Sequence, residues 1–230
     1  MAERRRSPSL WEQVQPIVPL LLAWIVAGVV VALAGAQKVV PVQTLFLDPQ
    51  AVGDAPWYAG VLSSIGILCW TVSAVAAAGG AWVAAQTNRP GAASFLAGGA
   101  IATAVLLVDD LFLLHSDAMP KLLGTPKLVN IAVVLAPTFV WVLSQREELQ
   151  RTRHATLASA FGALGLSVVA DRFLTDPTLG LVIEDGAKLF GIVAWMIYFV
   201  LTSRDIARST INAALREQDS PFPDRFDVFG

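Results

Sequence analysis

Five ionisable side chains lie inside otherwise apolar stretches of the chain: Asp109, Asp110, Glu184, Asp185 and Lys188. A charge at membrane depth costs about 2.5 kcal/mol or more, so it usually marks a site that faces the interior of a helix bundle or a polar pathway. Carboxylates in such a place bind hard cations such as Ca²⁺, Mg²⁺ or Mn²⁺, or take part in proton transfer. These five residues are therefore our candidates for cation or proton binding.

Apolar runs of about twenty residues surround these charges, and a helix of that length crosses a bilayer. Hydrophobic residues make up 55% of the 230 residues and charged residues only 15%. We therefore predict an all-α fold, an integral membrane bundle of six transmembrane helices at 17–36, 58–85, 93–115, 128–144, 155–174 and 180–202. The six-span domain covers residues 1–203 in this prediction, and a polar cytoplasmic tail covers residues 204–230.

The distribution of basic residues predicts the orientation. The segments expected on one side carry eleven arginines: Arg4, Arg5, Arg6, Arg89, Arg146, Arg151, Arg153, Arg204, Arg208, Arg216 and Arg225. The loops on the other side carry only Lys38, Lys121 and Lys127. Because basic residues concentrate in cytoplasmic segments, we predict that both termini are cytoplasmic. Arginines outnumber lysines twelve to four in this Ala- and Gly-rich chain, which favours the plasma (inner) membrane of a bacterium.

The first predicted span has an alternative interpretation. Its basic start, its apolar run and the sequence Ala34-Gly35-Ala36 before Gln37 resemble a secretory signal with a small-residue cleavage site. The apolar run is longer than a usual signal core, which favours a retained span.

The predicted topology brings the charged residues to one level of the membrane. Asp109 lies about 21 Å along its outward-running span, and Asp171 lies about 24 Å along another. Glu184, Asp185 and Lys188 fall in the first turns of an inward-running span. All of them are therefore expected in the outer third of the bilayer, around an outward-facing acidic cluster.

Several of these charges are close enough in sequence to neutralise one another. Glu184 and Lys188 are four residues apart, so they can pair along one face of a helix. Near the end of the fifth span, Arg172 is expected to form a supporting ion pair with Asp171 or Asp176.

Helical phase separates the polar residues of the third span. Asp109 and Asp110 point about 100° apart, and on a continuous helix His115 lies well round from both. We therefore expect one aspartate to face the centre of the bundle and the other to pair laterally with Arg172 or Lys188, with His115 near the helix end.

A divalent metal ion is the only cofactor that the sequence raises. Its candidate ligands are Asp109, Asp110, His115 and Glu184. Such a site could activate water for hydrolysis or transfer on a lipid.

One short segment is similar to a known family. The sequence VDDL at 108–111, followed by His115, is similar to the third-span pattern of the ceramidase and progestin-receptor superfamily of intramembrane metal hydrolases. That resemblance implies a zinc ion held by polar residues of several spans. It covers one span, and the HxxxH of the last span is replaced here by Glu184, Asp185 and Lys188, so we do not assign the chain to that superfamily.

Three functions remain open from the sequence. The first is cation or proton binding and translocation, the second is a metal-dependent intramembrane hydrolase or transferase acting on a lipid, and the third is a structural or assembly subunit. The expected surroundings are membrane lipids, with a homo-oligomer left open and no nucleic acid partner.

Overall fold

The computed structural model describes residues 58–218 without a gap, together with 25, 28–29, 31–33, 35–39 and 53–56. The chain divides into two compact units, Met1–Ala59 and Gly60–Gly230. The predicted first span, 17–36, falls mostly outside the described residues, although those described at 28–29, 31–33 and 35–36 are helical. The count of six spans, the question of cleavage and the cytoplasmic placement of both termini therefore stay predictions.

The second unit is built from five long helices. They are α5 (Val61–Gln86), α6 (Pro90–Phe112), α8 (Lys127–Ser144), α10 (His154–Phe173) and α11 (Pro177–Gln218). Three short elements connect them: the π-helix η1 (Leu114–Ala118), α7 (Met119–Leu123) and α9 (Arg146–Gln150). Within the described ranges the chain forms no strand, which agrees with the predicted all-α class.

In the described part of the chain, these five long helices are long and apolar enough to cross a membrane. This indicates a membrane protein. Each lies within a few residues of a predicted span, except that α11 continues without a break to Gln218. The first part of the predicted polar tail is thus a continuation of the last helix.

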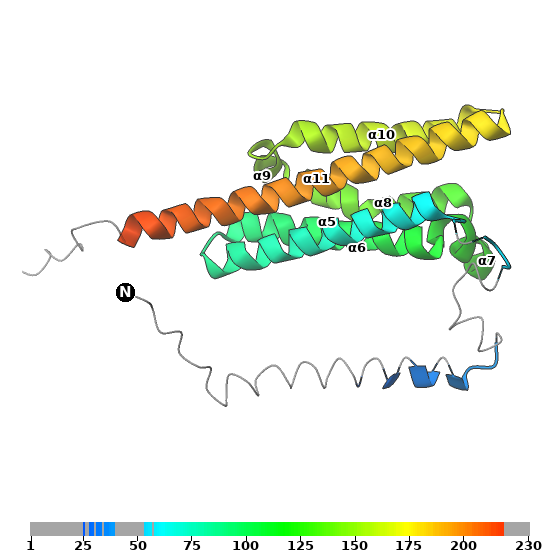
Figure 1. Ribbon diagram of the computed structural model, residues 1–230, viewed down its shortest axis with the longest axis horizontal. Helices are drawn as coiled ribbons and strands as arrows, with labels where there is room; N and C mark the ends of the chain where they lie inside the picture. The colour runs from blue at the N-terminus through cyan, green and yellow to red at the C-terminus, as the bar shows by residue number, and fades with distance from the viewer. Residues whose placement is uncertain are drawn as a thin grey trace, which may run out of the picture. The chain divides into compact units, whose positions relative to one another are not determined.

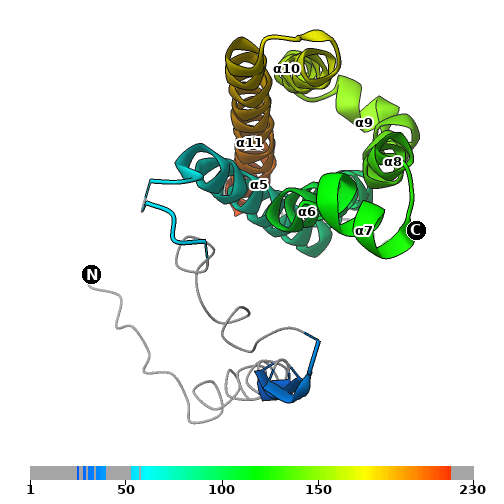
Figure 2. The same ribbon diagram turned by 90° about the vertical axis from the view of Figure 1, so that its right-hand side faces the viewer.

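The long helices run side by side in alternating directions (Figure 1). Their closest neighbours follow the order α10, α11, α5, α6 and α8, and Figure 2 shows this order as a ring seen from one end. The ring is not closed by packing, because α8 and α10 contact one another far less than the four neighbouring pairs do. The starts of α5, α8 and α11 lie at one end of the bundle, which we call the cavity end because a cavity opens there. We call the opposite end the α9 end.

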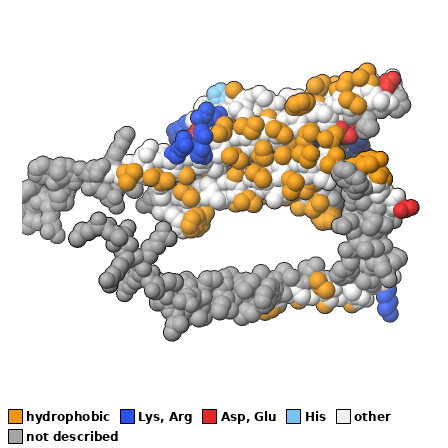
Figure 3. Space-filling view, viewed as in Figure 1, with side chains coloured by type: hydrophobic (Ala, Val, Ile, Leu, Met, Phe, Trp, Pro, Cys, Tyr) orange, Lys and Arg blue, Asp and Glu red, His pale blue; other side chains and the backbone are white. Residues whose placement is uncertain are grey.

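The surface of the bundle matches a membrane environment. Hydrophobic side chains cover the flank between the two ends, whereas Lys and Arg gather near α9 and acidic side chains lie toward the cavity end (Figure 3). Exposed large apolar residues occur on all five long helices, such as Leu68, Ile101 and Phe139. Apolar groups of this kind are stable next to lipid, where the helices satisfy their own backbone hydrogen bonds.

Aromatic side chains fill the middle of the bundle. Trp195 of α11 is fully buried and lies with its ring centre 5.7 Å from that of Trp70, 6.0 Å from that of Trp141 and 5.4 Å from that of Phe161. Glycines allow the helices to approach these rings, since a Cβ at Gly99 would lie 2.5 Å from the ring of Phe199. The packed aromatic core thus closes the bundle below its cavity end.

Candidate functional site

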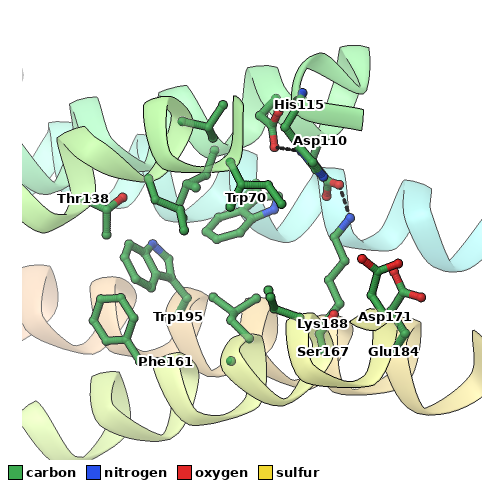
Figure 4. A pocket seen from close by; sticks show the side chains of 18 of the residues that line it. Trp70, Asp110, His115, Thr138, Phe161, Ser167, Asp171, Glu184, Lys188 and Trp195 are labelled. Carbon is green, nitrogen blue, oxygen red and sulfur yellow. Dashed lines mark hydrogen bonds and ion pairs between the residues drawn. The ribbon is translucent and has the colours of Figure 1, made fainter. Parts of the chain in front are cut away.

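A cavity of about 320 Å³ opens into the ring at the cavity end, and Figure 4 shows it from close by. Its wall is formed by α5, α6, η1, α8, α10 and α11. The volume falls at the lower end of the range for small-molecule sites, which is roughly 300–1,000 Å³. Of the predicted site residues, Asp109, Asp110, His115, Asp171, Glu184 and Lys188 line it, and Asp185 and Arg172 do not.

A break in the helix pairs His115 with Asp109. The α6 helix ends at Phe112, and Leu113 adopts a left-handed conformation with φ 50° and ψ 44°. This turn allows the His115 backbone N–H to donate to Asp109 Oδ1 at 2.8 Å, and His115 Nδ1 lies 2.7 Å from Asp109 Oδ2. The expectation that His115 lies far round the helix from Asp109 is therefore wrong, because it assumed a helix that continues to residue 115.

Asn130 of α8 holds this turn from the other side. Its side chain is buried, its Nδ2 donates to the His115 carbonyl at 3.4 Å and to the Thr125 carbonyl at 3.3 Å, and its Oδ1 accepts a hydrogen bond of 2.6 Å from the Thr125 hydroxyl. The sequence signal for this role is an asparagine within the apolar run 128–144, and the predicted site does not include it.

Asp110 forms an ion pair with Lys188, which joins α6 to α11. This is one of the two lateral pairings predicted for the third span. The carboxylate is 8% exposed and the lysine side chain 36% exposed, so the pair lies at the edge of the buried region. The predicted pairing of Lys188 with Glu184 is not what the structure contains, because the ammonium group reaches across to α6.

Asp171 pairs with Lys127 instead of Arg172. The two charged atoms are 2.7 Å apart and connect the end of α10 to the start of α8. Neighbouring helix residues point about 100° apart, so Asp171 faces α8 while Arg172 faces elsewhere. Asp176, the other partner expected for Arg172, accepts hydrogen bonds from backbone N–H groups at the start of α11.

Glu184 lines the cavity next to Asp171 and Lys188 (Figure 4). Among the described residues its carboxylate has no hydrogen bond and no ion pair. Around the cavity, four carboxylates face two ammonium groups, which leaves a formal charge of −2 when His115 is neutral and −1 when it is protonated. The charged end of the cavity therefore favours a positively charged group.

The described residues contain no group of three or more His, Cys, Asp or Glu side chains placed to hold a metal ion. The four candidate ligands are divided between different contacts. Asp109 is paired with His115, Asp110 is paired with Lys188, and Glu184 lies beside Asp171. This geometry gives no support to the predicted metal site.

Away from the charges the cavity is mainly apolar. Its wall there consists mostly of aliphatic and aromatic side chains: Leu106, Ile131, Val134, Leu135, Phe161, Leu164 and Trp195. Two buried polar atoms without a hydrogen-bond partner among the described residues belong to this lining, the Trp70 Nε1 and the Thr138 hydroxyl. A buried polar group without a partner costs about 1–3 kcal/mol.

The cavity also reaches the flank of the bundle between α8 and α10. Phe139 of α8 is 57% exposed, Val168 of α10 is 52% exposed, and both line the cavity. Gly165, also exposed, lies one turn before Val168 on the same wall. At the cavity end, the pair of Lys127 and Asp171 crosses this opening. The cavity is thus open toward the side that faces lipid in a membrane.

Comparison with known proteins places the chain in a family. No curated protein and no solved structure is similar enough to count as a match. The family described as "Domain of unknown function (DUF8692)" matches residues 21–202, about four fifths of the chain, and includes every residue that lines the cavity. The chain therefore belongs to the DUF8692 family.

Proposed function

We propose that this membrane protein binds a small cationic amphiphile, a molecule with a positively charged head and an apolar body, in the cavity between α8 and α10. The single observation that carries the proposal is the division of one cavity into a charged end and an apolar remainder, with an opening on the lipid-facing flank. The proposal keeps the cation binding expected from the sequence and adds an apolar part to the bound molecule.

The head is expected beside Glu184 and Asp171. Lys188 is already paired with Asp110, and Lys127 with Asp171, so the carboxylate of Glu184 has no ion pair of its own among the described residues. An ammonium group there would neutralise the excess negative charge of the cavity. An anionic head would instead add to it and is disfavoured by Coulomb repulsion.

The body is expected in the apolar part of the cavity. Leu106, Val134 and Phe161 offer it aliphatic and aromatic contacts, and the Trp195 ring forms the far wall. A bound molecule can reach this space sideways from the bilayer, between Phe139 and Val168, without crossing the charged end. Lateral access of this kind suits a molecule that already resides in the membrane.

Binding is favoured over translocation because the charged residues do not continue through the middle of α5 and α6. α5 contains no Asp, Glu, Lys, Arg or His, and α6 contains only Asp109 and Asp110 of these types, both in its last turn. Below them lie the buried rings of Trp195, Trp141 and Phe199. These features support a site that is filled and emptied from one region of the protein.

The experiment is a titration of the full chain in nanodiscs of neutral phosphatidylcholine with dodecylamine, dodecanol and dodecanoate, followed by calorimetry. We expect dodecylamine to bind more tightly than the other two. Glu184→Gln should weaken dodecylamine binding about tenfold, because removing one charge near an ammonium group costs about 1.4 kcal/mol at the dielectric of a partly exposed site.

Asp185→Asn is the matched control, since it makes the same change at the next position of α11, on an exposed side chain that does not line the cavity. It should leave the affinity within about twofold. Equal affinity for the three probes, no binding of dodecylamine, or equal effects of the two variants would overturn the proposal.

A further inference from the structure

A second hollow, of about 410 Å³, lies at the α9 end of the bundle. Its wall is formed by the start of α6, by α9, by the connection 151–153 and by α11. Arg151 and Arg153 line it together with the carboxylates of Glu148 and Asp205. None of these residues lines the cavity at the other end, so this hollow is separate from the site of the proposed function.

The charges around the hollow favour an anion. The two arginines and two carboxylates of the wall cancel in formal charge. Two more arginines are bonded to wall residues, since Arg89 donates to the Ser209 hydroxyl at 2.5 Å and Arg204 Nη2 lies 3.2 Å from Asp205 Oδ1. Four arginines and two carboxylates therefore leave a formal charge of +2 around the hollow.

The arginines of the wall keep most of their N–H groups for a ligand. Arg153 donates from Nε to Asp205 at 3.1 Å, and Arg151 donates from Nη1 to Glu148 at 2.9 Å. Among the described residues neither side chain forms another hydrogen bond or ion pair. A guanidinium has five N–H donors, so both terminal nitrogens of Arg153 are available, and such a fork matches two oxygens of a phosphate. The two side chains are 71% and 56% exposed, so an approaching ligand can reach them.

The hollow lies at the level where the predicted spans end. Ala92 of its wall precedes the predicted span 93–115 by one residue, Arg153 precedes the span 155–174 by two, and Asp205 follows the last span by three. The basic side chains near α9 adjoin the hydrophobic flank of the bundle (Figure 3). When that flank lies in a bilayer, the hollow is therefore level with the lipid headgroups, where basic pockets between helices bind anionic lipids.

The geometry points to a binding site for the phosphate of an anionic phospholipid in this hollow. The phosphate accepts hydrogen bonds from Arg151 and Arg153, and the acyl chains stay in the bilayer. The excess positive charge favours an anionic lipid over a zwitterionic one, and the position at the span ends favours a lipid over free phosphate. The site is independent of the amphiphile that we propose for the cavity.

The test is a calorimetric titration of the full chain in a nonionic detergent with dioctanoyl phosphatidylglycerol, dioctanoyl phosphatidylcholine and inorganic phosphate. We expect phosphatidylglycerol to bind at least about tenfold more tightly than the other two, since it alone combines a net negative charge with an apolar part. The double variant Arg151→Gln, Arg153→Gln removes the charge-assisted donors, so its affinity for phosphatidylglycerol should fall to within about twofold of that for phosphatidylcholine.

The matched control is the double variant Arg146→Gln, Arg208→Gln. It removes two exposed arginines near the same end that do not line the hollow, and its affinity should stay within about twofold of wild type. Asp205→Asn removes a negative charge from the wall and releases Arg153, so it should tighten phosphatidylglycerol binding about threefold. A damaged fold would not produce this gain.

Equal affinities for phosphatidylglycerol and phosphatidylcholine, equal losses in the two double variants, or no gain in Asp205→Asn would overturn the site. Inorganic phosphate that binds as tightly as phosphatidylglycerol would overturn its assignment to a lipid. None of these results bears on amine binding in the cavity, so the two proposals can fail separately.

Discussion

Replacing Lys188 by methionine would leave the carboxylate of Asp110 without a counter-charge at a position where it is 8% exposed. Removing one partner of a fully buried ion pair costs about 3–5 kcal/mol. The lysine side chain is 36% exposed, so water can partly replace it, and we expect a loss of about 2–3 kcal/mol in the free energy of unfolding. Methionine keeps most of the apolar length of the side chain, so little packing is lost.

The second variant, Asp110→Asn, separates the ion pair from other effects. In the double variant with Lys188→Met no unpaired charge remains, so the combined loss should be smaller than the sum of the two single losses by about 2 kcal/mol. The unfolding free energies can be measured in mixed micelles by titration with sodium dodecyl sulfate, followed by circular dichroism.

The control is Lys121→Met, which breaks an ion pair with Asp117 in which the two side chains are 73% and 51% exposed. Such a pair contributes at most about 1 kcal/mol, so this variant should be close to wild type. A coupling energy below about 0.5 kcal/mol between Asp110 and Lys188, or an equal loss in Lys121→Met, would refute the conclusion that this contact joins α6 to α11.

Three further predictions concern the packing and the turn beside the cavity. Gly80→Ala should destabilise the bundle by about 1–3 kcal/mol, because the added Cβ would lie 2.5–2.8 Å from side chains of α6 and α11. The control is Gly79→Ala, which should not destabilise the bundle, because its Cβ would meet no atom within 4 Å. Equal thermal stability of the two variants would contradict this prediction. Leu113→Gly should stabilise the protein by about 1 kcal/mol, since the left-handed conformation is unfavourable for leucine, and a loss of stability in the same titration would argue against the turn. Asp109→Ala should increase hydrogen exchange at the His115 amide at least about fivefold, because that N–H loses its acceptor, and unchanged exchange would mean that the contact is not maintained in the membrane.

Much of the fold could be predicted from the sequence because it depends on the length and hydropathy of each segment. The ends of α8 and α10 differ by at most one residue from the predicted limits of their spans. The end of the last helix was harder to predict, since α11 continues beyond the apolar run into a polar sequence. A helix can continue from lipid into water without a break. Hydropathy reports where a membrane begins and ends, and a helix need not end there.

The contacts of the site were only partly predictable. The convergence of Asp109, Asp171 and Glu184 on one region follows from alternating helix directions, and all three line the cavity. The partners of these residues depend on the rotation of each helix about its axis and on local breaks in the helices. Hydropathy predicts neither, so it does not predict the left-handed conformation of Leu113 that brings His115 to Asp109.

The residues of the apolar part were missed for a different reason. Trp70 and Thr138 lie within apolar runs where a tryptophan or threonine is ordinary, and their importance comes from a missing partner. A missing partner can be recognised only when the neighbouring helices are in place. The sequence predicts a loop position for Lys127, whereas the structure places it at the first position of α8, from which its side chain reaches across to α10.

The most direct test of amphiphile binding in the cavity uses the glycines of α10. A side chain at Gly165 would extend into open space on the wall of the cavity, and one at Gly162, a turn earlier on the same helix, would also meet no atom within 4 Å but does not line the cavity. The measurement is the quenching of tryptophan fluorescence by a dodecylamine brominated near the middle of its chain, on the full chain in phosphatidylcholine nanodiscs. We predict saturable quenching in wild type and in Gly162→Phe and its loss in Gly165→Phe, whereas equal quenching in all three proteins would contradict binding in this cavity.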